Sequence, residues 1–317
     1  MNSREDRKKS RKSKYLKIIL GILLVLFAGT GTYAYNIYND VKDTVDNKVH
    51  KPVDSIKLTP EQKEKISNQE PVNILLMGVD EREHDQGRAD TLIILSINPN
   101  INKMQMISIP RDSRTLIKGK GIEDKINHSY AFGGSDMTIA TVENFADIEL
   151  DYYAKLNMEG LVELVDALGG ITVHNKLDWY DSGYYEKGFH YEKGDLNLNG
   201  EQTMGFVRMR YQDPNGDFGR NERQREVIRA IIDKGASIGS IPKIDQFLEV
   251  IGNNIETNMT FEDMKDLFSN YRSASQNSTS YQVKGNGTKI DNIYYLIVSE
   301  QERDKIHDMI TDFNQKK

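Results

Sequence analysis

Positive charge is concentrated in one short stretch of an otherwise acidic chain. The segment from Phe206 to Ala230, FVRMRYQDPNGDFGRNERQREVIRA, holds six arginines, whereas the whole chain of 317 residues carries a net charge of −6. Arginine offers a planar, permanently charged fork of donors that fits the oxygens of phosphate or carboxylate groups. Because an acidic body repels polyanions in general, this cluster indicates a local site for one anionic ligand.

The spacing of these arginines predicts which of them converge. If VRMR (207–210) is extended, Arg208 and Arg210 point to one face while the apolar residues between them enter the core. Further along, NERQREVIRAIIDKGA (221–236) predicts a helix, and Arg220, Arg223 and Gln224 share a face if that helix starts near residue 219. The other two arginines have glutamate neighbours and are expected on the solvated helix surface: Arg225 and Arg229.

A second group of polar residues lies at the ends of predicted strands. Short runs rich in Ile and Val, bounded by turn residues, predict buried strands at 72–80, 90–98 and 103–110. Ligands of open α/β sheets bind at strand ends. Any one of these residues could be an ordinary turn residue, but together with the later arginines they favour one site: Asp80, Arg88, Asp90, Arg111, Asp112 and Arg114.

Guanidiniums and carboxylates in one place indicate a diphosphate ligand. Asp80 and Asp90 offer hard oxygen ligands for Mg²⁺, a cation commonly held by one or two carboxylates plus substrate phosphates, and Mn²⁺ could substitute for it. Phosphoryl transfer needs little beyond such charge stabilisation and a positioned nucleophile. Asp217 adds a carboxylate to the same region.

Several other chemistries are excluded or disfavoured. The sequence contains no nucleotide-binding glycine loop, no HExxH and no GxSxG motif. There is no cysteine, so thiol chemistry is excluded, and the six histidines are scattered without the spacing of metal ligands. An acidic chain with an isoelectric point near 5.6 also disfavours nucleic acid as a partner.

Helices alternate with the predicted strands. Apolar residues at helical intervals predict helices at 133–147, 156–170 and 221–236, with a strand at 171–175 and a closing helix at 299–313. The fold class expected from this order is α/β, with a mixed central sheet sandwiched between helices. Residues 72–317 would form this one catalytic domain.

The N-terminal region predicts a membrane anchor. Residues 1–17 hold eight Lys or Arg, and an uncharged apolar run follows from Ile18 to Tyr35. By the positive-inside rule, 1–17 is a cytoplasmic tail and 18–38 a single transmembrane helix, as in a type II membrane protein. Residues 39–71 are expected to form a partly helical extracellular stalk, and the rest is expected to be extracellular. A cleaved signal peptide is the alternative.

Without that basic tail the chain is more acidic still. Removing its eight basic and two acidic residues from the 42 and 48 of the whole chain leaves a net charge of −12. The exported part is therefore soluble but repels polyanions, and the arginine-rich segment stands out against it.

Several motifs together resemble a known family. In order and spacing, they are similar to motifs of the LytR-CpsA-Psr family of bacterial cell-wall glycopolymer ligases. The motifs are NILLMGVD, RADTLIILSINP, ISIPRDSR, DKINHSYAFGG, LVDALGGITV and LNGEQTMGFVRMRYQDPNGDFGRNERQREVI. The likeness covers the anchor and residues 72–236. The last motif looks like those of the members in Gram-positive bacilli that attach wall teichoic acid.

The resemblance implies a phosphotransferase at the outer face of the cell membrane. Family members move a glycopolymer from an undecaprenyl diphosphate carrier to a muramic acid hydroxyl of peptidoglycan, forming a phosphodiester with Mg²⁺ at the diphosphate. The lipid tail would lie in an apolar tunnel whose walls include the helix at 156–168 and the strands at 91–97 and 104–109. Two other functions stay open, namely a hydrolase of polyprenyl diphosphates and a non-catalytic wall-binding regulator.

The resemblance also assigns roles residue by residue. Asp80 and Asp90 match the family's metal-binding aspartates. Asp217 or Asp90 could accept the proton of the attacking hydroxyl, or either could only orient arginines, and Arg111 is expected to act in catalysis. The expected contacts to the diphosphate are Arg88, Arg111, Arg114, Lys125, Arg208, Arg210, Arg220, Arg223 and Gln224.

Overall fold

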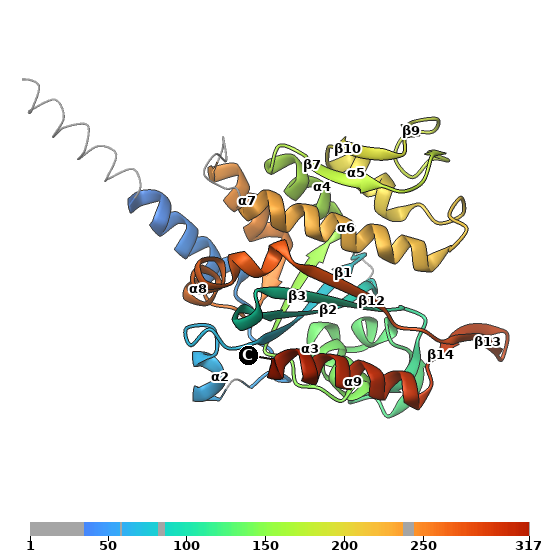
Figure 1. Cartoon of the computed structure of the whole chain (residues 1–317), viewed down its shortest axis with the longest axis horizontal. Helices are drawn as coiled ribbons and strands as arrows, with labels where there is room; N and C mark the ends of the chain where they lie inside the picture. The colour runs from blue at the N-terminus through green and yellow to red at the C-terminus, as the bar shows by residue number, and fades with distance from the viewer. Residues whose placement is uncertain (1–34, 58, 82–85, 237–243, 317) are drawn as a thin grey trace, which may run out of the picture.

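A mixed six-stranded sheet forms the centre of the computed structural model, which describes residues 35–57, 59–81, 86–236 and 244–316 (Figure 1). Neighbouring strands β1, β2 and β3 are antiparallel, β6 runs parallel to β1, and β12 runs parallel to β3. The order across the sheet is β11 (Ile255–Thr257), β6 (Tyr152–Asn157), β1 (Val72–Val79), β2 (Ala89–Asn98), β3 (Lys103–Ile109) and β12 (Ser278–Gln282).

The three strands predicted from apolar runs are confirmed, and so is the mixed sheet between helices. Alternation along each strand sends side chains to both faces. Leu75 and Met77 of β1 therefore join one apolar cluster, and Ile74 joins another on the opposite face. Both faces of the sheet are buried, which explains why the strands read as continuous apolar runs.

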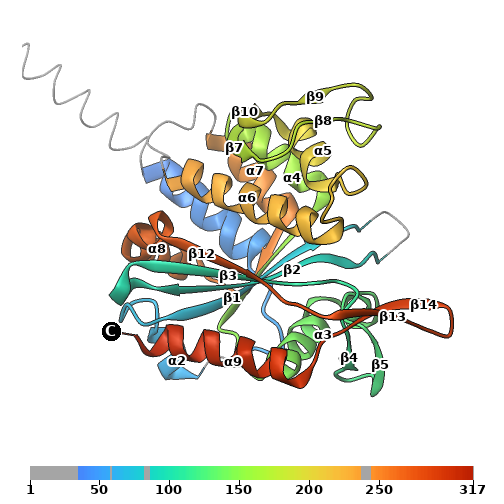
Figure 2. The same ribbon diagram turned by 45° about the vertical axis from the view of Figure 1, so that its right-hand side comes forward.

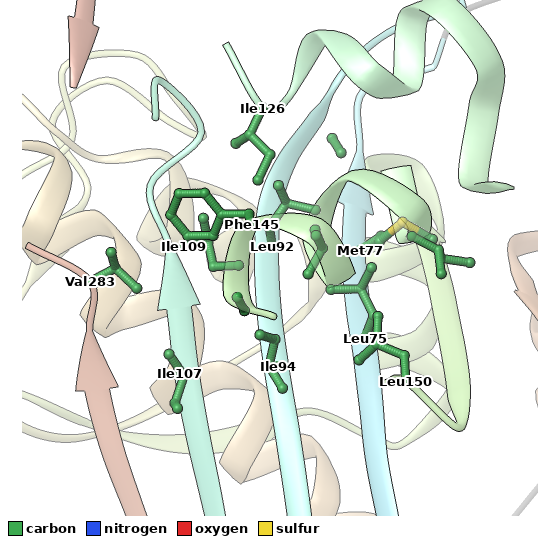
Figure 3. Close-up of a cluster of buried hydrophobic side chains, with 14 of the residues drawn as sticks. Leu75, Met77, Leu92, Ile94, Ile107, Ile109, Ile126, Phe145, Leu150 and Val283 are labelled. Carbon is green, nitrogen blue, oxygen red and sulfur yellow. The ribbon is translucent and has the colours of Figure 1, made fainter. Parts of the chain in front are cut away.

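Helices α3 (His128–Ala146) and α9 (Glu300–Gln315) cover one face of the sheet (Figures 1 and 2). Figure 3 shows the core beneath them, where Phe145 of α3 packs among side chains of the strands, including Leu92 and Ile109. The predicted helix at 133–147 starts five residues earlier and is kinked at Gly133 and Gly134, whose backbone angles are not helical.

The opposite face carries the longest helix, α6 (Asp217–Ala236), together with α8 (Phe261–Tyr271) (Figures 1 and 2). Behind α6 lies a third apolar cluster, and its aromatic members include the buried Trp179, Tyr191 and Phe206. That region is built from α4 (Met158–Ala167), β7 (Ile171–Asn175), β8 (Trp179–Tyr180), β9 (His190–Tyr191), β10 (Gly194–Leu198), α5 (Gly200–Arg208) and α7 (Ile244–Asn254).

Two small hairpins extend from the end of the sheet at which β3 finishes. Their strands touch through the bridge between Ser113 and Leu296, and the Leu296 amide donates to the Asp112 carbonyl at 2.9 Å. The hairpins are formed by β4 (Arg114–Ile117) with β5 (Ile122–Lys125), and β13 (Asn286–Ile290) with β14 (Ile293–Ile297). Two short 3₁₀ turns complete the fold, η2 (Pro99–Ile101) and η3 (Arg272–Gln276).

The predicted cytoplasmic tail, 1–17, lies outside the described residues, as does the predicted membrane helix up to residue 34. Residues 35–44 are helical, followed by the π-helical turn η1 (Val45–Val49) and the short α2 (Pro60–Glu64). Part of the expected stalk packs on the domain, since Val45, Val49 and Ile66 are buried. Within the ranges described, no helix is both long and apolar enough to cross a bilayer.

Residues 207–210 are not extended, so the condition under which Arg208 and Arg210 would share a face is not met. Asn199 and Gln202 form a capping box that starts α5, and the helix continues through Arg208. Met209 is the first residue to leave the helix, with ψ at 131°, and it is fully buried. The capping box at the start of α5 therefore outweighed the short alternation of apolar and basic residues at 207–210.

The expectation that Arg225 is solvated is also wrong. Its side chain is buried, and Nη1 donates to Ser108 Oγ at 2.6 Å and to Gln282 Oε1 at 2.9 Å. Arg229 donates through Nε to Ser278 Oγ at 2.8 Å. These two arginines tie α6 to β3 and β12, so they hold the helix over the sheet.

Close packing of α4 on α5 gives a first prediction. An added Cβ at Gly200 would lie 2.2 Å from the carbonyl oxygen of Val162, a backbone atom that cannot move alone. We expect Gly200→Ala to lower the free energy of unfolding by about 1–3 kcal/mol, the usual cost of overpacking. Urea denaturation would measure it, with the exposed neighbour Glu201→Ala as a control that changes stability by less than ~0.5 kcal/mol. Equal midpoints for the two variants would contradict the packing argument.

Candidate active site

The site begins where β1 ends and β2 starts. The amide of Asp80 donates to the Arg88 carbonyl at 3.2 Å, and the amide of Asp90 donates to the same oxygen at 3.1 Å. Gly87 makes this approach possible: its φ is +67°, and a Cβ there would lie 2.2 Å from the Asp80 carbonyl oxygen. The backbone thus brings Asp80, Arg88 and Asp90 to one point, as the sequence predicts.

Asp90 connects this point to β3 and α3. Its Oδ2 accepts from Arg111 Nη1 at 2.8 Å, and its Oδ1 accepts from Asn127 Nδ2 at 3.2 Å. The Asn127 amide donates in turn to the Arg111 carbonyl at 3.3 Å. Sequence reasoning missed Asn127, although its place directly before a helix is a signal for a polar cap.

The start of α6 supplies the third side of the site. Asp217 Oδ1 lies 2.8 Å from Arg220 Nη2 and 4.0 Å from Arg210 Nε. Burial lowers the pKa of Arg220, and the neighbouring charges of Arg111 and Arg210 lower it further, whereas Asp217 opposes the shift. Asp90, Arg111, Arg210, Asp217 and Arg220 therefore converge as predicted, and we call them the arginine cluster.

Several polar atoms of the arginine cluster make no hydrogen bond within the described protein, although Arg220 Nη2 and Asp217 Oδ1 form the ion pair given above. Arg111 Nε, Arg220 Nε and Nη2, and Asp217 Oδ1 are buried without a hydrogen bond among the residues described. Buried polar groups are otherwise almost always paired, and an unpaired one costs about 1–3 kcal/mol. Three of these four atoms are guanidinium donors, so an anion with several oxygens fits the site.

The donor set also fits a divalent cation bound together with that anion. Across the described ranges, no three His, Cys, Asp or Glu side chains are grouped closely enough to hold a metal ion by themselves. Asp80 and Asp90 would supply one or two carboxylates, which suits Mg²⁺ only where phosphate oxygens complete its coordination.

Other predicted residues lie around the arginine cluster at different distances. Gln224 is buried one turn beyond Arg220, and Arg208 is half-buried at the end of α5. Lys125 donates to Asp112 at 2.7 Å, and Asp112 lies 3.9 Å from Arg111 Nε. The structure does not bring Arg114 into the cluster, since its Nη1 pairs with Glu123 on the neighbouring strand.

Arg223 requires a correction, because its guanidinium does not face the arginine cluster. Nε donates to the Phe206 carbonyl at 2.9 Å, and the two terminal nitrogens donate to the Met209 carbonyl and to Asp213 Oδ2. All three nitrogens are thus engaged within the protein. Arg223 clamps the loop between α5 and α6 rather than presenting a free donor.

An apolar cavity of about 540 Å³ lies between the sheet and the helices α4, α6 and α8. The predicted tunnel walls contribute to it through Met158, Leu161 and Leu164 of the helix and Leu95 and Met104 of the strands. The inner faces of α6 and α8 also line it, in addition to the walls that the resemblance implied. The structure therefore has an apolar cavity where the resemblance implied the tunnel for the lipid tail.

One face of α6 joins the cavity to the arginine cluster. Arg220 in its first turn belongs to the cluster, Gln224 one turn later lines the cavity, and Ile228, Ile231 and Gly235 follow along the cavity wall. Residues three or four apart share a helix face. The side chains on this face change from charged to apolar along the helix. Such a surface suits an amphiphilic ligand with a charged head and an apolar tail.

Comparison with known proteins agrees with these motifs. The model of the LytR_cpsA_psr family matches residues 31–311. The chain belongs to the LytR_cpsA_psr family. The resemblance read from the sequence is confirmed.

Relatives in the LytR_cpsA_psr family include wall-polymer transferases. The polyisoprenyl-teichoic acid--peptidoglycan teichoic acid transferase TagU of Bacillus subtilis is 46% identical over 297 residues, covering 94% of each chain. Its crystal structure superposes with a TM-score of 0.64 at 45% identity, over 78% of this chain and 98% of that one.

Two further relatives of known structure carry different descriptions. A structure of TagT bound to LI-WTA is 29% identical, with a TM-score of 0.67 over 77% of this chain and 91% of that one. A protein of Enterococcus faecalis described as a transcriptional regulator is 38% identical, with a TM-score of 0.69 over 78% and 88%.

The different surroundings of Arg220 and Arg223 give a second prediction. Arg223→Met removes one partner of a buried ion pair with Asp213, and we expect the free energy of unfolding to fall by about 3–5 kcal/mol. Arg220→Met also breaks an ion pair, with Asp217 at 2.8 Å, but it removes a guanidinium that burial and like charges disfavour, so the loss of stability should be clearly smaller. Urea denaturation of both variants would measure the difference.

The same pair of variants separates structure from function. Arg220→Met should remain folded yet lose affinity for a diphosphate ligand, measured by titration calorimetry. A loss of stability in Arg220→Met as large as that in Arg223→Met would show that Arg220 is a structural residue.

Proposed function

We propose that this protein is a phosphotransferase that moves a glycopolymer from a polyprenyl diphosphate carrier to a hydroxyl group of peptidoglycan. The observation that carries the proposal is the face of α6, on which a buried arginine cluster leads directly into an apolar cavity. A diphosphate joined to a polyprenyl chain has the same two halves. TagU, at 46% identity, is named for this reaction.

The donor would bind with its tail in the cavity and its diphosphate at the arginine cluster. The Nε atoms of Arg111 and Arg220 are buried donors without a hydrogen bond in the described protein, and they would donate to the phosphate oxygens. Arg210, Arg208 and Gln224 border the same place. Asp80 and Asp90 would hold Mg²⁺, which when bound supplies positive charge to the diphosphate oxygens.

The transfer step would be an in-line displacement at the phosphorus nearer the glycopolymer. The acceptor hydroxyl forms a new P–O bond, and the bond to the bridging oxygen of the diphosphate breaks. Polyprenyl phosphate leaves, and the arginines stabilise the charge that develops on the oxygens. The hydroxyl proton passes to a carboxylate.

Asp217 is the better candidate for that carboxylate. Both oxygens of Asp90 already accept hydrogen bonds, from Arg111 and from Asn127. Asp217 Oδ1 forms an ion pair with Arg220 Nη2 at 2.8 Å but accepts no hydrogen bond of good geometry within the described residues. The proposed roles therefore separate, with Asp90 orienting Arg111 and Asp217 receiving the proton.

The cellular setting belongs to the same proposal. The glycopolymer would be wall teichoic acid, and the substrates would place the domain outside the cell, held by a single membrane-spanning segment within 18–38 as a type II protein. The acidic body would keep other anionic wall polymer from binding beyond the arginine cluster.

An in vitro transfer assay tests the proposed function. The full chain in detergent would receive a short teichoic precursor on a lipid diphosphate and uncrosslinked peptidoglycan oligomer, with Mg²⁺ or EDTA, and mass spectrometry would read the products. We expect a phosphodiester-linked product that disappears with EDTA and falls by about 100-fold or more in Arg111→Ala, as when a transition-state donor is removed.

A matched control keeps this result specific. Arg229→Ala removes an arginine from the same helix as Arg220, but its partners are Ser278 and Glu226, outside the site. It should retain transfer. Release of phosphorylated polymer without linkage would instead identify a hydrolase, and binding of donor without either product would identify a non-catalytic regulator.

A further inference from the structure

A group of aromatic side chains, two exposed and two half-buried, lies beside the arginine cluster and takes no part in the steps above. It is carried by the β8–β9 hairpin, the loop between its strands, and the loop before α6. We call it the aromatic platform and define it as Tyr180, Tyr184, His190 and Tyr211.

The β8–β9 hairpin separates two layers of aromatic rings. Trp179 pairs with Tyr191 across the strands, stacked at 4.0 Å and buried, whereas the next pair, Tyr180 and His190, stacks at 4.3 Å on the outer side. This follows from the alternation of side chains along a strand. The inner pair serves the core, while Tyr180 remains 56% exposed.

The loop that follows Tyr180 is held in one shape before any ligand binds. The buried carboxylate of Asp181 accepts hydrogen bonds from four successive amides, those of residues 183–186, at 2.6–3.0 Å. Burial alone would raise the pKa of Asp181, but these four donors lower it. The loop therefore presents Tyr184 without an ordering cost on binding.

The aromatic platform adjoins the arginine cluster directly. Gln212 Nε2 donates to the Tyr180 carbonyl at 2.6 Å, which ties the hairpin to the arginine-bearing loop. Tyr211 is 83% exposed, with the Arg210 guanidinium 5.8 Å from its ring centre. Burial raises the pKa of the Tyr184 hydroxyl, Tyr211 raises it further, and Arg210 and Arg220 oppose the rise, so Tyr184 lies between the two groups.

Exposed aromatic faces of this kind suit sugar rings. The face of an aromatic ring is electron-rich and attracts the polarised C–H groups of a pyranose, while the Tyr180 hydroxyl offers a hydrogen bond at its edge. Contiguous exposed aromatics beside a site mark a binding surface rather than ordinary solvent exposure.

The in-line geometry decides which sugar lies there. The leaving polyprenyl phosphate points into the cavity, so the attacking hydroxyl must approach from the side of the arginine cluster away from the cavity. The aromatic platform borders the arginine cluster through Tyr211 and Arg210, and none of its residues lines the cavity. The exposed carboxylates of Asp178 and Glu192, which flank His190, would also repel a polyanionic donor chain.

We propose that the aromatic platform binds pyranose rings of the acceptor glycan and so positions its hydroxyl at the arginine cluster. This inference rests on the proposed transfer reaction for the direction of attack. It assigns to Tyr180 and Tyr211 a role in recognising the acceptor, separate from the binding of the diphosphate.

Direct binding gives the first test. A peptide-free tetramer of alternating N-acetylglucosamine and N-acetylmuramic acid would be titrated into the full chain in detergent and followed by saturation-transfer NMR. We expect Tyr180→Ala and Tyr211→Ala each to weaken binding roughly threefold to tenfold, the range for one aromatic contact. Tyr294→Ala, an exposed tyrosine of β14 outside the aromatic platform, should change nothing.

Steady-state transfer gives the second test. Tyr180→Ala and Tyr211→Ala should raise KM for the acceptor by the same factor, with KM for the lipid donor and kcat unchanged, and Tyr211→Phe should behave like the wild type. A rise in donor KM alone would assign the surface to the donor and overturn the inference. Equal glycan affinity in all variants, or none in the wild type, would overturn it too.

The two tests separate this inference from the proposed function. If the glycan binds and the two alanine variants weaken it, while no transfer occurs with the wild type, the aromatic platform stands and the transferase proposal fails. If the wild type transfers the polymer and both alanine variants transfer it equally well, the transferase proposal stands and the inference about the aromatic platform fails.

Discussion

The geometry of the site depends on one buried side chain, the guanidinium of Arg223. It bonds the carbonyls of Phe206 and Met209 and the carboxylate of Asp213, and thus fixes the end of α5 and the following loop against α6. The contact is so close that a Cβ at Gly219 would meet Asp213 Oδ2 at 1.9 Å. Arg208 and Arg210 reach the site because this clamp holds the chain on either side of them.

The clamp allows like charges to gather where they would otherwise separate. The two buried guanidiniums at the centre have opposite surroundings. Burial lowers the pKa of Arg111, but Asp90, Asp217 and Asp112 outweigh this and raise it. For Arg220, burial and the neighbouring arginines prevail and lower the pKa. The carboxylates of the protein thus compensate the positive charge of Arg111, whereas the charge of Arg220 is less well compensated. A phosphate oxygen would therefore be stabilised most beside Arg220.

The sequence predicts the parts of the fold that local physics decides. Strands 72–80, 90–98 and 103–110, and the convergence of Asp90 with Arg111, follow from apolar runs and strand ends. Long-range contacts decide the rest. Arg220 and Arg223 lie close together on one helix surface, yet one faces the cluster and the other faces a loop. Arg225 is buried only because Ser108 and Gln282, far away in sequence, accept from it. Periodicity predicts which residues share a helix face, but not which part of the protein packs against that face.

The cavity illustrates the same limit. Ile228 and Ile232 belong to an apolar cluster with Met264, as core residues would, yet they line about 540 Å³ of space that is partly open to solvent. The walls of this cavity are almost entirely apolar and offer water few hydrogen-bond partners. An apolar occupant would therefore be stabilised by displacing that water, and its polar end would emerge where Gln224 gives way to Arg220.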